Sequence, residues 1–162
     1  MSLITEEALE WSRQPFEQRQ FGVARHDIAK YAQSIGANDP VYSDVDVARA
    51  AGHPDILAPP YFPIVARMHT VHLFGRESLE PDGSPTEDVP PIHSKRAMAG
   101  ETELELGAPV HAGDTLTIDK KIVEMYEKEG SSGPLVFVKM EFDFHNQHGH
   151  RVLRERYTRI YR

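Results

Sequence analysis

Apolar side chains recur at helical spacing through the first half of the chain. One face of a predicted helix over 25–36 carries four of them, and we expect it to be buried: Ile28, Tyr31, Ala32 and Ile35. Gly36 and then Pro40 end this helix. The same reasoning predicts helices over 5–12 with Thr5 as N-cap, over 45–51 with Ser43 or Asp44 as N-cap, and over 63–75.

The segment from 56 to 75 differs from the other helical segments. Almost every position after Pro63 is apolar or histidine, and no helix breaker follows before Gly75. A helix that is apolar on most sides is a buried helix. We therefore expect residues 63–75 to form the central helix of the fold.

From residue 93 onward, apolar side chains recur at every second position. Thr102, Leu104 and Leu106 alternate with glutamates, which predicts a half-buried strand. Other strands are predicted over 18–24, 116–125, 134–145 and 152–161, with turns at 112–114 and 146–149 and a hairpin loop at 128–133. In the strand over 134–145 we expect one face to carry Val136, Val138, Met140 and Phe142, and the other Phe137 and Phe144.

Helices followed by a run of antiparallel strands indicate an α+β fold, with a curled sheet around one helix. The sequence shows no repeat and no domain boundary, so we expect a single domain over 1–162. In this interpretation residues 1–14 are an N-terminal helical extension. The segment 76–92 is rich in Pro, Gly and acidic residues and is expected to be a long loop.

Composition excludes several classes of function. The 162 residues carry a net charge of -7, which argues against a general nucleic-acid-binding face. There is no cysteine, so disulfides, thiolate metal sites and cysteine nucleophiles are excluded. No apolar run reaches the length of a membrane span, and no signal-peptide core is present at the N-terminus. We expect a cytoplasmic protein.

The turn over 36–44 joins two predicted helices, and such a turn can place short polar side chains in a cleft. Its residues, Gly-Ala-Asn-Asp-Pro-Val-Tyr-Ser-Asp, resemble the active-site turn of the MaoC-like hydratases and dehydratases. These are hotdog-fold enzymes that act on acyl thioesters, and their turn reads Asp-x-Asn-Pro-x-His. Pro40 stands at the position of the Pro in that turn, and the acidic Asp44 follows at the usual place. Ala37, however, stands at the position of the catalytic Asp, and Tyr42 stands at that of the His.

The second half of the chain narrows the resemblance. The segments 96–100, 113–114, 128–138 and 157–162 together look like the N-terminal MaoC-like, or fatty-acid-synthase-type, dehydratase domain. That branch includes the N-terminal halves of mesaconyl-CoA hydratases and non-catalytic subunits of hydroxyacyl dehydratases. The resemblance implies that a second hotdog, with the intact Asp/His pair, extends the sheet of this one. It therefore implies a homodimer or a heterodimer with a catalytic MaoC-like subunit.

Hydration of an enoyl thioester needs a base, an acid and donors to the thioester oxygen. Ala37 and Tyr42 do not supply the first two. The resemblance assigns the third to a Gly amide where this chain reads Ala58-Pro59-Pro60, and proline has no N–H. We therefore expect the chain to shape the acyl pocket of an (R)-specific enoyl-CoA hydratase or 3-hydroxyacyl-thioester dehydratase. The alternative is a site rebuilt from Asp39, Tyr42 and His72, although an Asp in a turn also bonds its own backbone.

Candidate substrate-binding residues lie at the opening of the central helix, along it, and at the start of the next strand: Pro59, Pro60, Tyr61, His69, His72, His93, Lys95, Arg96 and Gly100. His69 and His72 share a helix face, where they line an acyl tunnel, supply an acid, or are core histidines bonded to carbonyls. Lys95 and Arg96 meet CoA phosphates, or else form a solvated strand end. The expected substrate is an acyl-CoA or acyl carrier protein thioester of fatty acid metabolism, with no cofactor.

Three histidines near the end of the chain, His145, His148 and His150, straddle a predicted turn. No carboxylate has the right spacing beside them, so we expect no metal site. His53 and His111 are expected in loops. Two other classes of function remain open: an acyl-thioester binding or scaffold protein without turnover, and a hotdog thioesterase. The thioesterase is disfavoured because residues 61–74 contain no carboxylate.

Overall fold

The computed structural model describes residues 2–69, 79–80, 85–93 and 96–162. Its helices are α1 (Glu6–Arg13), α2 (Arg25–Ser34), α3 (Val45–Ala50) and α4 (Pro63–His69), with short 3-10 helices η1 (Pro40–Tyr42) and η3 (Thr86–Asp88). Its strands are β1 (Arg19–Gly22), β2 (Ala97–Leu106), β3 (Thr115–Gly130), β4 (Gly133–His145) and β5 (Arg151–Tyr161). The predicted α+β class is confirmed. Throughout the described ranges, every helix is too short or too polar to cross a membrane.

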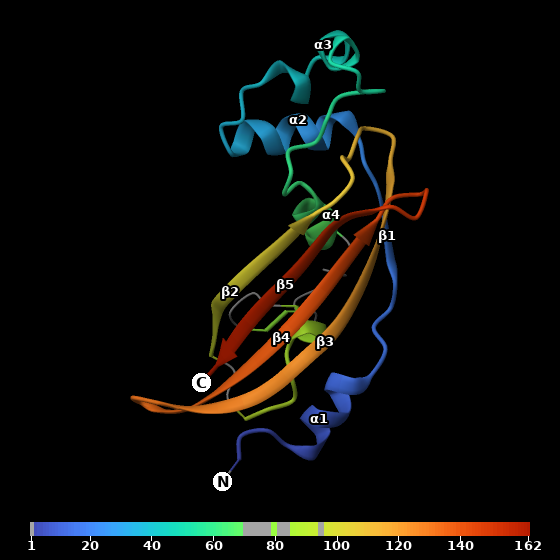
Figure 1. Ribbon diagram of the computed structural model, residues 1–162. Helices are drawn as coiled ribbons and strands as arrows, with labels where there is room; N and C mark the ends of the chain where they lie inside the picture. Colours follow the sequence, from blue (N-terminus) through green and yellow to red (C-terminus); the bar gives the residue numbers. More distant parts are fainter. Residues whose placement is uncertain (1, 70–78, 81–84, 94–95) are drawn as a thin grey trace.

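All five strands belong to one antiparallel sheet, in the order β1-β3-β4-β5-β2. The sheet curls, and α4 lies behind it in the view of Figure 1. The helices α2 and α3 lie beyond one end of the sheet, and α1 lies near the other end (Figure 1). The predicted curled sheet around a central helix is therefore confirmed.

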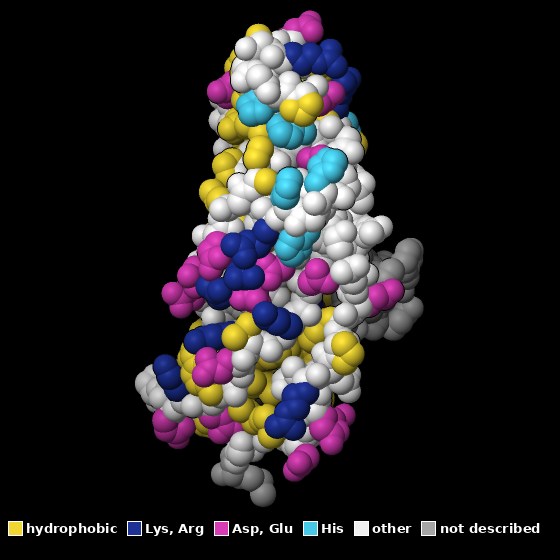
Figure 2. All heavy atoms as spheres, turned by 45° about the vertical axis from the view of Figure 1, so that its right-hand side comes forward, with side chains coloured by type: hydrophobic (Ala, Val, Ile, Leu, Met, Phe, Trp, Pro, Cys, Tyr) yellow, Lys and Arg dark blue, Asp and Glu magenta, His cyan; other side chains and the backbone are white. Residues whose placement is uncertain are grey.

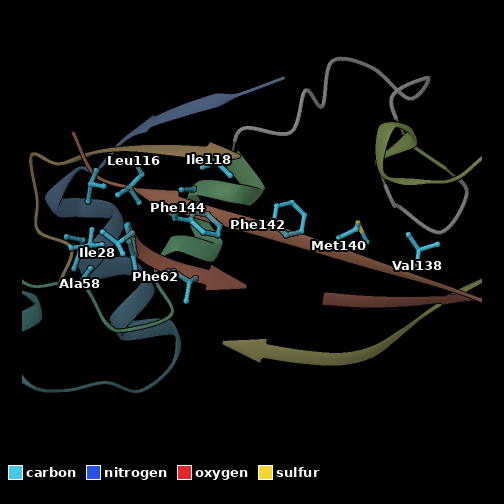
Figure 3. Close-up of a cluster of buried hydrophobic side chains, with 14 of the residues drawn as sticks. Ile28, Ala58, Phe62, Leu116, Ile118, Val138, Met140, Phe142 and Phe144 are labelled. Atoms are coloured by element: carbon cyan, nitrogen blue, oxygen red, sulfur yellow. The ribbon is translucent and has the colours of Figure 1, made fainter. Parts of the chain in front are cut away.

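The core forms where the concave face of the sheet meets the helices. Alternate side chains of β4 from Val136 to Phe144 are buried on this face, and Phe62 and Ile28 belong to the same cluster (Figure 3). The expectation that Phe144 lies on the opposite face is wrong. Side chains alternate along a strand, so Phe144 shares the face of Phe142, and its exposed fraction is 0%.

The predicted helix–turn–helix is confirmed in its main features. Gly36 has a φ of +70°, a conformation that favours glycine, and it follows α2. Asp44, rather than Ser43, caps α3, because its side chain accepts hydrogen bonds from the amides of Asp46 and Val47. Ile35 was expected on the buried face but is 54% exposed, because it lies at the C-cap beyond the last helical turn.

Two expectations for the second half need correction. The hairpin loop is shorter than 128–133, since β3 and β4 stay paired to Gly130 and Gly133. The strand β2 is not half-buried: Leu104 and Leu106 are 39% and 61% exposed. Both leucines are paired with inward-facing residues of β5, so they lie on the concave face at a margin that the described helices leave open.

The central helix is also less enclosed than its composition predicts. Of the seven residues of α4, Pro63 and Ala66 are buried, whereas Met68 is 53% exposed. The remainder of the predicted helix, 70–75, lies outside the described residues. At the other end of the chain, Thr5 caps α1 as expected, because its hydroxyl accepts from the amide of Ala8 at 3.0 Å.

Candidate functional site

The turn before α3 has its polar side chain engaged with its own backbone. Asp39 is the N-cap of η1, and its Oδ1 accepts a hydrogen bond from the amide of Val41 at 3.0 Å. The Asp39 side chain is exposed, and Ala37 beside it offers only a methyl group. The geometry is that of an Asp that stabilises a turn.

Tyr42 and the prolines before α4 meet in one hollow of about 230 Å³. Almost the whole lining is apolar, with the Tyr42 side chain as its one polar side chain among the described residues. The walls come from the turn, the segment before α4, the end of β2 and the start of β5: Tyr42, Leu57, Ala58, Pro59, Pro60, Leu106, Gly107, Ala108, Pro109, Val110 and Val152. Tyr42, a predicted alternative catalytic residue, and Pro59 and Pro60, predicted substrate contacts, thus line the same hollow, whereas its wall at 106–110 was not predicted.

The backbone around this hollow has few N–H groups to offer. Ala58 donates its amide to the carbonyl of Val110 at 2.8 Å, and Leu57 donates to Val41 at 3.0 Å. Pro59 and Pro60 have no amide hydrogen. From residue 57 to residue 60, therefore, no backbone donor is left for a thioester oxygen in the hollow.

A buried polar cluster lies on the concave face beneath α4. Glu155 of β5 is 1% exposed, and its carboxylate accepts from the Tyr61 hydroxyl at 2.7 Å and from Nη1 of Arg67 at 3.0 Å. The Arg67 guanidinium also lies 4.8 Å from the centre of the Phe142 ring. Burial, together with the hydrogen bond to Glu155, raises the pKa of Tyr61 well above its ordinary value. Tyr61 is thus held by the sheet and is not among the residues that line the hollow.

Sequence reasoning missed Glu155, although a signal was present. Glu155 is in phase with Leu153 and Tyr161, and side chains two residues apart on a strand share a face. A glutamate in the inward phase of a strand has to find a partner when it is buried. That partner is Arg67, which lies among mostly apolar residues on α4.

The other predicted substrate contacts are dispersed. His69 lies in a separate open hollow of about 490 Å³ between α2 and α4, beside Lys30 and Tyr31. His93 and Arg96 are exposed, and Gly100 packs against the backbone of β5. His72 and Lys95 lie outside the described residues. The structure thus groups Tyr42, Pro59 and Pro60 and leaves the remaining described candidates apart.

Two histidines expected in loops form a pair behind the wall of the hollow. Nδ1 of His53 and Nε2 of His111 are 3.1 Å apart, so one ring donates and the other accepts. His111 follows Val110 and is bridged to Leu57, both of which line the hollow. By contrast, the rings of His148 and His150 are 6.3 Å apart in an exposed turn. The described residues contain no group of three His, Asp or Glu side chains that could hold a metal ion.

The His53–His111 pair should make the folding stability of the chain depend on pH. Burial lowers the pKa of His111, and so does the charge of His53, against the opposing effect of Asp114 and Asp55. A lowered pKa means that the unfolded chain binds the proton first, so stability falls as the pH drops below about 6.5. When the pH is lowered from 7.5 to 5.5, the free energy of unfolding measured in urea should fall less for His111→Gln than for the wild type, because the variant lacks the titrating ring.

The matched control for this prediction is His148→Gln, on the exposed turn after β4. It should keep the full wild-type difference between the two pH values. If the free energy of unfolding depends on pH equally in the wild type and in His111→Gln, the prediction is contradicted.

Comparison with known proteins identifies the family. Residues 11–155 match the family model described as the FAS1-like, dehydratase domain region. A UPF0336 protein of Clavibacter michiganensis subsp. michiganensis is 34% identical over 110 residues, which cover 68% of this chain and 67% of that protein.

Solved structures share the fold. A chain of the ChsH1–ChsH2 complex from Mycobacterium tuberculosis matches 97% of this chain and 89% of its own length, with a TM-score of 0.74 and 20% identity. A chain of the HadBC (3R-hydroxyacyl-ACP dehydratase) complex, also from Mycobacterium tuberculosis, matches 88% and 90% of the two chains, with a TM-score of 0.66 and 18% identity. The MaoC-like dehydratase from Rhodospirillum rubrum matches 91% and 92%, with a TM-score of 0.62 and 18% identity. The chain therefore belongs to the FAS1-like dehydratase domain family and has the hotdog fold of the MaoC-like dehydratases.

Proposed function

We propose that this chain forms the acyl pocket of an (R)-specific enoyl-CoA hydratase or 3-hydroxyacyl-thioester dehydratase, and that a partner hotdog carries out the chemistry. The proposal rests on which residues this chain has at the family's active-site positions. Ala37 and Tyr42 stand where the resemblance places the acid/base pair, and the segment from 57 to 60 has no backbone donor to spare. Hydration needs all three elements in one site.

The lining of the hollow is suited to an apolar ligand. Its lining is made of Leu, Ala, Pro, Val and Gly residues with one tyrosine, which suits a hydrocarbon tail rather than a charged group. Tyr42 can donate one hydrogen bond to such a ligand. His93 and Arg96 are exposed, but they precede β2 at Ala97, whereas the hollow lies at the other end of that strand, beside Leu106. Their contact with CoA phosphates stays a prediction.

A rebuilt catalytic site has less support. Asp39 already accepts a hydrogen bond from Val41 and points to solvent. Tyr42 lines the hollow, but a phenol alone supplies neither a base near neutral pH nor a second donor. Binding of an acyl thioester without turnover by the isolated chain is consistent with the same geometry.

The partnership has support in two of the similar structures, because the ChsH1–ChsH2 and HadBC assemblies from Mycobacterium tuberculosis are complexes. The test is reconstitution with a MaoC-like subunit that carries an intact Asp-x-Asn-Pro-x-His turn. We expect hydration of a long 2-enoyl-CoA to increase at least tenfold when this chain is added, because the added hollow holds the tail. If the partner hydrates the long substrate equally well alone, the pocket role is contradicted.

A further inference from the structure

One wall of the hollow is built from two segments that run side by side. Leu57 and Ala58 belong to the first segment and Val110 to the second, and all three line the hollow. The amide of Ala58 donates to the carbonyl of Val110 at 2.8 Å, and Leu57 forms an antiparallel bridge with His111. The amide of Leu57 also donates to the carbonyl of Val41 at 3.0 Å, which joins this wall to η1. A movement of either segment therefore moves the lining of the hollow.

The His53–His111 pair fastens the same two segments through side chains. His53 precedes the first segment, and its amide donates to the carbonyl of Ala48 in α3 at 3.0 Å. His111 follows directly after Val110 in the second segment, and its side chain is only 14% exposed. The facing nitrogens, Nδ1 of His53 and Nε2 of His111, are 3.1 Å apart. The hydrogen bond between the rings thus links the end of α3 to the far side of the wall.

On the side of His53, the neighbouring charges do not favour a charged imidazole. The Asp55 carboxylate is occupied, because it accepts two hydrogen bonds from the guanidinium of Arg25, at 2.8 and 2.6 Å. The Arg49 side chain reaches the residue after His53, with its Nε 3.4 Å from the carbonyl of Pro54. A cation so close to a histidine opposes its protonation.

On the side of His111, a carboxylate opposes the effect of burial. Oδ2 of Asp114 lies 4.0 Å from Nδ1 of His111 and accepts a hydrogen bond from the His111 amide at 2.8 Å. Its Oδ1 accepts from Nε2 of Gln147 at 2.9 Å, and this nitrogen lies 3.2 Å from Nε2 of His148. Burial outweighs the carboxylate, so the pKa of His111 is lowered.

The pair can hold one extra proton but not two. When both rings are neutral, one facing nitrogen donates and the other accepts. A first extra proton binds an outer nitrogen and keeps the bond, because a charged ring is the stronger donor. A second puts N–H groups on both facing nitrogens, so the acceptor is lost and two positive rings oppose each other. The two protons are therefore coupled, and the second binds only below about pH 6.5.

We propose that His53 and His111 are positioning residues for the hollow, because their shared hydrogen bond holds its two wall segments together. Double protonation breaks this bond and lowers the affinity of the hollow for an apolar tail. The closed wall binds fewer protons than the open one, so the affinity is full near neutral pH and falls as the pH drops. This inference rests on the proposed function, which assigns the hollow to the acyl group, and it adds a control on the wall of that site.

The experiment follows binding of octanoyl-N-acetylcysteamine to the full, nitrogen-15-labelled chain by NMR at pH 7.5 and pH 5.0. This thioester has an acyl tail and no phosphate, so its charge is the same at both pH values. We expect its addition to shift the amide signals of Leu57, Ala58 and Val110. We also expect a dissociation constant about fivefold larger at pH 5.0, which is the factor that one hydrogen bond contributes.

Two variants separate protonation from packing. His111→Gln places an amide near the position of Nε2, and because this amide does not titrate, the ratio of the two dissociation constants should fall below about two. His111→Leu removes the bond at both pH values, so it should bind the probe about fivefold more weakly than the wild type at pH 7.5.

The control has to be another histidine, since Figure 2 shows histidine side chains gathered on the half of the molecule toward α2 and α3. His150→Gln, in the exposed turn after β4, is the matched variant and should keep the wild-type ratio.

Failure of this inference is distinguishable from failure of the proposed function. Equal wild-type affinity at the two pH values, an unchanged ratio in His111→Gln, or full affinity of His111→Leu at pH 7.5 overturns the positioning role while the hollow keeps its ligand. If the probe shifts no amide of the hollow, both proposals fail. Hydration of enoyl-CoA by the isolated chain overturns the proposed function alone. Unfolding curves show whether His111→Leu is folded, and if it is not, the ratio in His111→Gln decides.

Discussion

Glu155→Ala should destabilise the fold by about 3 kcal/mol. The substitution removes the carboxylate that accepts from the Tyr61 hydroxyl at 2.7 Å and from Arg67 at 3.0 Å. The Arg67 side chain is only 19% exposed, so its guanidinium would lose the Glu155 counter-charge in a region of low dielectric constant. For a chain of this length we expect the melting temperature to fall by about 10 °C, measured by thermal or urea unfolding.

Two comparisons show whether burial is the cause. The exposed pair of Lys139 and Glu124, at 3.0 Å, serves as a surface control, and Glu124→Ala should cost less than about 1 kcal/mol. The double variant Glu155→Leu with Arg67→Met removes both charges and should recover most of the loss, because a buried pair can often be replaced by apolar side chains. A loss in Glu155→Ala no larger than that in Glu124→Ala would contradict the buried-cluster interpretation.

Ala108→Phe should impair the use of long substrates by the reconstituted complex much more than the use of short ones. Ala108 lines the hollow and is partly buried, and its amide is already bonded to the carbonyl of Arg151 at 2.9 Å. A phenyl ring at this position takes up space that the tail of the acyl group needs. Each excluded methylene costs about 0.8 kcal/mol, so loss of two or three lowers kcat/KM for a long 2-enoyl-CoA about ten- to a hundred-fold.

Crotonyl-CoA provides the internal reference, because its tail is a single methyl group. Its kcat/KM should change by less than a factor of three. Ala50→Phe, at the exposed end of α3, is the matched control and should leave both substrates unaffected. An equal loss for both substrates in Ala108→Phe would point to misfolding or to a different tail site.

The elements of the fold could be predicted because each rests on a local signal. Capping residues and glycine marked the ends of α2 and α3, and alternation marked β4 and β5. Leu104 and Leu106 show where this reasoning stops. Alternation indicates which side of a strand a residue faces, but it does not reveal whether another layer covers that side.

The site could be predicted only in part, because its contacts join distant segments. Tyr42 and Pro59 were placed together by a resemblance, not by spacing. Glu155 meets Tyr61 across 94 residues of sequence, and His53 meets His111 across 58. Strand phase gave a usable signal for Glu155. Nothing local in the sequence signals the histidine pair, since it depends on how two loops lie against each other.

The most direct test of the central claim is hydration of crotonyl-CoA and of a long 2-enoyl-CoA by the purified chain alone, with Tyr42→Phe and Asp39→Asn measured beside it. We predict a folded chain that gives no turnover above the uncatalysed rate, with both variants identical to the wild type. Turnover at an ordinary enzymatic rate, about 1 s⁻¹ or more, that is lost in Tyr42→Phe or Asp39→Asn would contradict it, because it would place the acid/base step in this chain.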